Sequence, residues 1–293
     1  MSLPLQPSIL YSQNYLTDER LVATLIEKSS LGSGDIVYEI GPGKGILTRQ
    51  LARICKQVIA IEKEARLAAW LRQKFACQPE VTIRMGDCLQ DRLPNEPFKV
   101  FANIPFNITS AIVTRLTTTA RPPEDAYLIM QREAAEMYLG KPNEILRTVL
   151  LKPWFEVEVM HRFRRRDFTP APRVDVVMLR LRKRGPPLVS LKRRQCFRDF
   201  VVYSFTAWKP SLRHTYKGIF TRPQLKHIQA GLGINLDGSP TSLTFDQWLI
   251  LFNYLIEAGS TSALRRISGS KKRLIRQQRR LQKIHRTRNT RKS

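Results

Sequence analysis

A glycine-rich turn between a strand and a helix sets the fold of the first half of this chain. Residues 35–40 (DIVYEI) form a short β-branched run, residues 41–45 (GPGKG) follow it directly, and residues 46–54 (ILTRQLARI) have the apolar spacing of an amphipathic helix. Glycines let the backbone turn tightly and approach a ligand closely. This pattern predicts an open α/β sheet with a ligand at the carboxyl end of its first strand. An ordinary tight turn is the alternative.

Short β-branched runs alternate with helical patterns over the first 180 or so residues, which is typical of an α/β fold with a mostly parallel sheet. The strand candidates are residues 35–40, 57–62, 81–84, 98–102, 125–131, 155–163 and 174–181. Seven strands, with helices between the first five, predict a doubly wound, Rossmann-like sheet that ends in a hairpin. We expect this domain to occupy residues 1–184.

Two further zones follow the sheet. Gly185-Pro186-Pro187 has the composition of a linker, and residues 185–259 predict a small all-α domain, which we expect to bind RNA. Its clearest helix starts at Thr244, with Gln247 three residues later as a capping box. Residues 260–293 contain 13 Lys and Arg and no Asp or Glu, so we expect a disordered basic tail that binds nucleic acid.

The charge of the whole chain indicates a polyanionic partner. Lys and Arg number 50 against 24 Asp and Glu, a net charge of +26. No apolar run approaches the roughly 18–20 residues that a membrane-spanning helix needs, and Pro4 and Pro7 interrupt the N-terminal segment. The four cysteines form no CxxC pair and have no histidine at metal-ligand spacing. We therefore expect a cytoplasmic protein with reduced thiols, no metal and no membrane partner.

The glycine turn favours a cationic nucleoside as ligand over a dinucleotide. Its pattern is GxGxG rather than the GxGxxG of dinucleotide sites, and the acidic Glu39 stands beside it. A diphosphate would be poorly placed next to that carboxylate, whereas a sulfonium nucleoside would not. Glu62 ends the second strand, where it can accept hydrogen bonds from ribose hydroxyls, and Asp87 follows the third, where it can accept from an adenine amino group. Either acid alone is compatible with a surface position.

Asn103-Ile104-Pro105-Phe106 ends the fourth strand and suits chemistry on an adenine N6 amine. That amine is a poor nucleophile, because its lone pair is delocalised into the ring. The side-chain oxygen of Asn103 and the backbone carbonyl of Ile104 can accept its two N–H bonds and direct the lone pair at a methyl group. Phe106 offers a ring on which the base can stack. A buried turn with a core aromatic is the alternative.

These segments together resemble the ribosomal RNA adenine N6-methyltransferase family, which includes the Erm and KsgA enzymes. The resemblance covers about residues 12–258, in order, and rests on QNYL (13–16), EIGPGKG (39–45), Glu62, Gly86-Asp87, NIPF (103–106) and FTPAPRVD (168–175). It implies a seven-stranded methyltransferase sheet followed by a small helical domain, with S-adenosylmethionine as cofactor. One departure stands at Val176, where the family usually has Ser.

The resemblance also implies roles for individual residues. Asn14 and Leu16 would line the methionine end of the cofactor site, and the backbone would approach the cofactor at Gly41. Glu62 would hold the ribose and Asp87 the adenine. Asn103 would sit between the cofactor and the target amine, with Ile104 and Phe106 completing the catalytic loop.

Within the family, NIPF resembles the Erm branch, which acts on 23S RNA, whereas the small-subunit branch more often has NLPY. The expected product is dimethyladenine, and the expected consequence is resistance to macrolide, lincosamide and streptogramin B antibiotics. The expected partner is naked or partly assembled 23S RNA, bound by a monomer. The rivals are a small-subunit dimethyltransferase, a non-catalytic nucleic-acid-binding relative and, more distantly, a nicotinamide dehydrogenase.

We expect the RNA to be bound beside the catalytic loop. The target adenine must leave its stack to reach the cofactor, and Phe168 in FTPAP is a candidate stiff wall for its pocket. A plain structural turn is the alternative. The candidate phosphate contacts are Arg162, Arg164, Arg165, Arg166 and Arg173. A solvated basic face is the alternative for this set.

Overall fold

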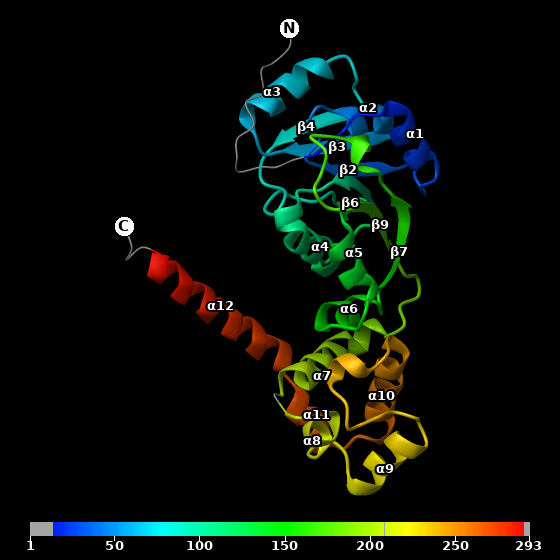
Figure 1. The fold of residues 1–293 in the computed structure, drawn as a ribbon, viewed down its shortest axis with the longest axis vertical. Coiled ribbons are helices and arrows are strands. Elements are labelled where there is room, and N and C mark those ends of the chain that lie inside the picture. The colour runs from blue at the N-terminus through cyan, green and yellow to red at the C-terminus, as the bar shows by residue number, and fades with distance from the viewer. Residues whose placement is uncertain (1–13, 208, 290–293) are drawn as a thin grey trace. The chain divides into compact units, whose positions relative to one another are not determined.

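The computed structural model describes residues 14–207 and 209–289 and is organised around a seven-stranded sheet (Figure 1). The strands of this sheet are β2 (Ile36–Ile40), β3 (Gln57–Glu62), β4 (Val81–Met85), β5 (Lys99–Asn103), β6 (Asp125–Gln131), β7 (Phe155–Arg162) and β9 (Val176–Lys183). All seven strands predicted from the sequence are therefore present. A second, two-stranded sheet pairs β1 (Tyr15–Leu16) with β8 (Phe168–Thr169) in antiparallel register.

The order of the strands is β4-β3-β2-β5-β6-β9-β7. The first five in this order run parallel, and β9 lies antiparallel to both β6 and β7. The doubly wound sheet with a terminal hairpin is thus confirmed. The order reverses between β2 and β5, and ligands of open α/β sheets bind outside the carboxyl ends of the strands at such a point.

Helices lie against both faces of the sheet (Figure 1). They are α1 (Glu19–Glu27), α2 (Ile46–Ala52), α3 (Ala65–Lys74), α4 (Thr109–Thr118) and α5 (Arg132–Leu139), with 3₁₀ turns at Phe106–Ile108 and Arg165–Asp167. The predicted helix between the third and fourth strands is wrong, because residues 86–98 connect β4 to β5 without one. The side chain of Asp87 stabilises the start of this connection, because its Oδ1 accepts the N–H of Leu89 at 2.9 Å.

The chain divides into two compact units. The sheet unit comprises the chain up to Glu136 and Phe155–Lys183, and the helical unit comprises Met137–Trp154 and the chain from Arg184 onward. The predicted boundary at residue 184 falls next to this division. Residues 137–154 were expected in the sheet domain but group with the helical unit. There α6 (Leu146–Leu151) packs against another helix of that unit.

The helical unit is built on an aromatic core. Its helices are α6, α7 (Arg194–Thr206), α8 (Leu212–Tyr216), α9 (Arg222–Ala230), α10 (Phe245–Ala258), α11 (Thr261–Ile267) and α12 (Ser270–Asn289), with 3₁₀ turns at Leu191–Arg193 and Pro240–Ser242. Phe200 contacts Tyr216, Trp248 and Phe252 with ring centroids 5.8–6.1 Å apart. The predicted capping box is confirmed, since the Thr244 N–H donates to Gln247 Oε1 at 3.0 Å and the Gln247 N–H to Thr244 Oγ1 at 3.3 Å.

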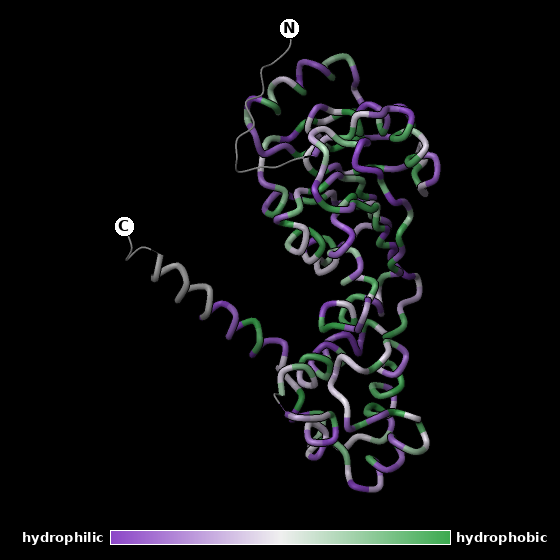
Figure 2. The backbone as a smooth tube through the Cα atoms, in the orientation of Figure 1, coloured by the Kyte–Doolittle hydropathy of each residue, from purple (hydrophilic) through white to green (hydrophobic). Residues whose placement is uncertain are grey.

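The basic tail is not disordered where the structure describes it. Helix α11 buries Ala263 and Ile267, and α12 follows after Gly269. Asp199 of α7 accepts the backbone N–H groups of Gly269 and Lys271 at 3.0 and 2.8 Å, which fixes the start of α12. The start of α12 is mainly hydrophilic, with one short hydrophobic interruption (Figure 2). The prediction of disorder assumed that the tail has too little apolar surface to fold on its own, whereas Ala263 and Ile267 of α11 are buried in the structure.

Candidate active site at the carboxyl ends of β2, β3 and β5

The glycine turn forms a close contact with Tyr15. Gly41 and Gly43 have φ values of 66° and 56°, in the left-handed region that favours glycine. A Cβ on Gly43 would lie 2.7 Å from the nearest atom of the Tyr15 ring. The Gly41 N–H donates to the Ile61 carbonyl at 3.0 Å, which ties the turn to β3. Only glycine at position 43 therefore allows the aromatic ring to lie over the turn.

Glu39 is a fully buried acid at the floor of this turn. Its Oε2 accepts the Thr48 hydroxyl at 2.7 Å, and its Oε1 is buried without a hydrogen-bond partner in the described structure. Burial raises the pKa of Glu39 to about 8, against the opposing effect of the Thr48 hydrogen bond. At neutral pH the carboxyl group is thus largely protonated. A cation bound close to it would lower this pKa and favour the ionised form.

Glu62 and Asp87 end neighbouring strands, as the sequence predicts. Glu62 is 5% exposed; its Oε1 accepts the Glu64 N–H at 2.9 Å, whereas its Oε2 is buried with no partner in the described structure. Burial raises the Glu62 pKa. Asp87 forms an ion pair with Lys63 at 3.3 Å, and the Leu89 N–H lowers its pKa. An unpaired buried acceptor at Glu62 fits a ligand hydroxyl.

The catalytic loop predicted from the sequence closes a small pocket. Asn14, Tyr15, Gly41 and residues 103–106 line it, and its enclosed volume is about 20 Å³. That is the space of about one water molecule, so it suits a single amine group rather than a whole base. Asn103 Nδ2 donates to the Asn14 carbonyl at 2.7 Å. This bond leaves Oδ1 as the acceptor that the chemistry requires.

Tyr15 lines the small pocket together with the predicted residues, whereas the side chain of Leu16 does not, and a role for Leu16 at the methionine end of the cofactor site remains a prediction. Leu16 is 5% exposed and packs in the core of the sheet unit, so its side chain does not line the pocket. Tyr15 takes that place. Strand alternation explains the exchange, because neighbouring side chains of a strand point to opposite faces. The QNYL motif contained Tyr15, and its position in β1 was the missing information.

The candidate RNA contacts separate into two kinds. Phe168 is 3% exposed and packs on Phe163 with ring centroids 5.2 Å apart, so the prediction that it forms a pocket wall is wrong. Its pairing with Leu16 across β1 and β8 places its side chain in the core. The five candidate arginines are all exposed, namely Arg162, Arg164, Arg165, Arg166 and Arg173. Arg165 lies 3.8 Å from Asp175. Their role in binding phosphate remains a prediction.

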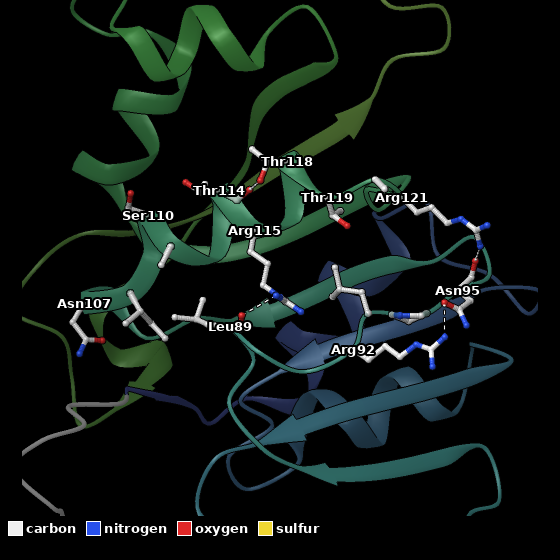
Figure 3. Close-up of a pocket in the computed structure, with 15 residues that line it drawn as sticks. Leu89, Arg92, Asn95, Asn107, Ser110, Thr114, Arg115, Thr118, Thr119 and Arg121 are labelled. Atoms are coloured by element: carbon white, nitrogen blue, oxygen red, sulfur yellow. Dashed lines mark hydrogen bonds between the residues drawn. The ribbon is translucent and has the colours of Figure 1, made fainter. Parts of the chain in front are cut away.

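A wider groove lies beside the pocket, between α4 and residues 89–95 (Figure 3). Its volume is about 1000 Å³, and its wall starts at Asn107, directly after the catalytic loop. Arg115 of α4 crosses it and donates from Nη1 to the Leu89 carbonyl at 2.7 Å and from Nη2 to the Asp91 carbonyl. Arg121 also links the two walls, donating from Nη1 to the Asn95 carbonyl at 2.7 Å (Figure 3). Arg115 thus holds the segment that follows Asp87.

The donor set at these strand ends fits a cationic nucleoside. Glu62 offers an unpaired buried oxygen, Glu39 a carboxyl group that can ionise, and the left-handed Gly41 and Gly43 a close backbone approach. The arrangement can hold a ribose, neutralise a positive charge and orient an amine at Asn103.

Comparison with known proteins agrees with this geometry. The family model described as "Ribosomal RNA adenine dimethylase" matches residues 6–257. An "rRNA adenine N-6-methyltransferase" of Bacillus licheniformis is 29% identical over 84% of this chain and 86% of its own length. A "Ribosomal RNA small subunit methyltransferase A" of Nostoc punctiforme is 30% identical over 87% and 96%. The crystal structure of the 23S rRNA methyltransferase ErmE superposes with a TM-score of 0.76, at 32% identity, over 83% of this chain and 100% of that one.

Proposed function

This chain belongs to the ribosomal RNA adenine dimethylase family, and we propose that it methylates N6 of an adenine in 23S ribosomal RNA. It is an rRNA adenine N6-methyltransferase with S-adenosylmethionine as its cofactor. The observation that carries the proposal is the hydrogen bond from Asn103 Nδ2 to the Asn14 carbonyl, because it engages Nδ2 within the protein and leaves Oδ1 as the atom that would accept from an incoming amine.

S-adenosylmethionine, when bound, supplies a methyl group on a positively charged sulfur. Asn103 Oδ1 and the Ile104 carbonyl would accept the two N–H bonds of the target amine and hold its lone pair in line with that methyl. Held by these two acceptors, the amine nitrogen would take the methyl group that the cofactor supplies, with the S–C bonding electrons left on sulfur and the amine proton released to solvent. Positioning of this kind can contribute several kcal/mol to the barrier reduction.

The remaining residues would bind the two substrates. Glu62 would accept the ribose hydroxyls and Asp87 the adenine amino group of the cofactor, with Asn14 and the Gly41 backbone at its methionine end. Phe106 is half-buried in the pocket wall and would stack on the target base. The five exposed arginines from Arg162 to Arg173 would bind RNA phosphates. We propose that the enzyme acts as a monomer in the cytoplasm, on naked or partly assembled RNA.

The choice of 23S RNA is supported by the NIPF sequence of the catalytic loop and by the likeness to ErmE. Two methyl groups on one adenine would block the macrolide, lincosamide and streptogramin B site, so we propose resistance to these drugs as the consequence.

No helix in the described part of the chain is long and apolar enough to span a membrane.

The test is incubation of the purified protein with radiolabelled S-adenosylmethionine and, separately, naked 23S and 16S RNA. We expect label in 23S RNA, and mass spectrometry of the digested product should find dimethyladenine. Label confined to 16S RNA would overturn the choice of substrate. That second candidate function is favoured by the Nostoc small-subunit relative, which matches a similar share of the chain. Loss of label from both RNAs in Asn103→Ala would exclude a contaminating methyltransferase.

A further inference from the structure

Three cationic side chains gather at the junction of α7 and α12 in the helical unit. The guanidinium groups of Arg194 and Arg198 lie over the ring of Trp154, with their central carbons 5.2 and 5.5 Å from its centroid. Lys271, at the start of α12, is close enough to both arginines for their charges to interact. All three side chains are partly buried. The cluster therefore combines like charges with reduced contact with water.

The carboxylate of Asp199, which lies beside this cluster, already accepts other hydrogen bonds. Asp199 is 4% exposed, and its oxygens accept the backbone N–H groups of Gly269 and Lys271 and the side-chain amide of Gln195 at 2.8–3.1 Å. These are neutral donors. In the part of the chain that the structure describes, no carboxylate lies within ion-pair distance of Arg194, Arg198 or Lys271. Arg194 Nε is also buried there without an acceptor.

The like charges of this cluster repel one another, and the charge of Asp199 offsets only part of that repulsion at Lys271. Burial and the neighbouring charge of Arg194 lower the pKa of Arg198 to about 10, and burial with both arginines lowers the pKa of Lys271 to about 8. Partly buried cations that repel one another are costly unless an anion pairs with them. Clusters of this kind are therefore typical of binding sites for anions. The Trp154 face alone is a weak partner for two guanidinium groups.

We propose that Arg194, Arg198 and Lys271 form a binding site for a phosphate group of the RNA backbone. Arginine guanidinium groups bind phosphate oxygens with paired hydrogen bonds, and a lysine adds a point charge. Exposed cations continue from the site along α12, namely Lys272, Arg276, Arg279 and Arg280. A single free anion would not need this continuation, whereas successive phosphates of a strand would. The inference rests on the proposed function only in taking RNA as the polyanion.

The experiment measures affinity for naked rRNA against salt concentration, with Arg198→Gln, Lys271→Gln and the double variant. Each phosphate contact contributes about 0.7–0.9 to the slope of log affinity against log salt. Between 50 and 200 mM salt, the loss of affinity should therefore shrink about threefold for each contact removed. Lys226→Gln, an exposed cation on α9 in the same unit, is the control with the same change in charge, and its slope should equal that of the wild type.

Thermal denaturation separates a binding role from a structural one. Because the cations repel one another, Arg198→Gln should keep or raise the Tm while it reduces the salt slope. A lower Tm with an unchanged slope would show a structural cluster and overturn the proposal. The second probe is inorganic phosphate at constant ionic strength: if it stabilises the wild type but not the variants, and the RNA slopes stay equal, the site binds a free anion instead. Binding is measured on both 23S and 16S RNA, so an error in the methylation target leaves this test intact.

Discussion

The side-chain amide of Asn103 donates a hydrogen bond from Nδ2 to the backbone carbonyl of Asn14 at 2.7 Å. A carbonyl only accepts, so the bond determines which amide atom is the nitrogen and which is the oxygen. It also joins the end of β5 to the segment that precedes β1. The oxygen of Asn103 is thereby fixed in orientation before any substrate binds, which is the form of preorganisation that lowers a barrier most effectively.

The first prediction is that Asn103→Asp strongly reduces methyl transfer. An aspartate has nearly the same shape but cannot donate to the Asn14 carbonyl, so a carboxylate oxygen would face that carbonyl and the side chain would turn away. Removal of one oriented hydrogen-bonding group of this kind costs about 10²–10³ in kcat. The measurement is kcat on rRNA with saturating cofactor, together with the affinity for RNA, which should not change by more than about twofold.

The control for this substitution is Asn107→Asp. Asn107 is exposed, lies just beyond the catalytic loop and receives the same added charge. Its kcat should stay near that of the wild type. If both variants lose activity equally, then negative charge near the RNA, rather than the bond to Asn14, explains the loss.

A second prediction concerns Glu62 and the cofactor. Glu62 Oε2 is a buried acceptor with no partner in the described structure, and a charged acceptor for a hydroxyl contributes about 1.5–3 kcal/mol. Glu62→Gln should therefore weaken the binding of S-adenosylmethionine about 10- to 100-fold, as measured by calorimetry. Glu64→Gln, two residues away and exposed, should leave the affinity unchanged. Equal affinity of Glu62→Gln and the wild type would remove Glu62 from the cofactor site.

Much of the sheet unit could be predicted from the sequence because its signals are local. Each buried strand is a short apolar run, several of them rich in β-branched residues, and the glycine turn follows β2 at once, so the strand ends near Glu62, Asp87 and Asn103 were identifiable. The burial of Leu16 and Phe168 was not, because it depends on the pairing of β1 with β8. These segments lie about 150 residues apart, and neither has a periodicity that indicates its partner.

The basic tail was mispredicted for a related reason. Its composition alone cannot support folding, yet its order comes from another helix: Asp199 of α7 caps the start of α12 through two backbone N–H groups. A lone acid in α7 gives no sign in the sequence that it caps a helix about 70 residues further on. The same limit applies to the cluster of Arg194, Arg198 and Lys271, which only the fold brings together.

A third prediction follows from the raised pKa of Glu39, about 8. An unfolded glutamate titrates near 4.3, so between about pH 4.3 and pH 8 the folded state binds more protons than the unfolded state. The stabilisation that protonated Glu39 provides is thus full below this range and is lost as the pH rises through 8. Glu39→Gln does not titrate, so the Tm of the variant relative to the wild type should increase from pH 6 to pH 9.

Thermal denaturation at both pH values in cofactor-free protein measures this difference. Thr48→Val is the companion variant, because it removes the hydroxyl that donates to Glu39 Oε2 at 2.7 Å and so raises the pKa further. In that variant the loss of stability should extend to a higher pH, because the folded-state pKa lies further above the unfolded one. A Tm difference between Glu39→Gln and the wild type that is the same at pH 6 and pH 9 would show that Glu39 is ionised throughout.

The fourth prediction separates two costs at Gly43. Alanine there would suffer strain at a φ of 56°, and its Cβ would also meet the Tyr15 ring at 2.7 Å. Gly233 has a similar φ of 63° with no atom within 4 Å of a built Cβ, so Gly233→Ala should show the strain alone, about 1–2 kcal/mol. Gly43→Ala should destabilise by more than this and should lower cofactor affinity, because the ring must move.

In a Tyr15→Ala background the excess should vanish, since the clash is gone while the strain remains. If Gly43→Ala costs the same in both backgrounds, as followed by denaturant unfolding, the ring of Tyr15 does not lie on the turn.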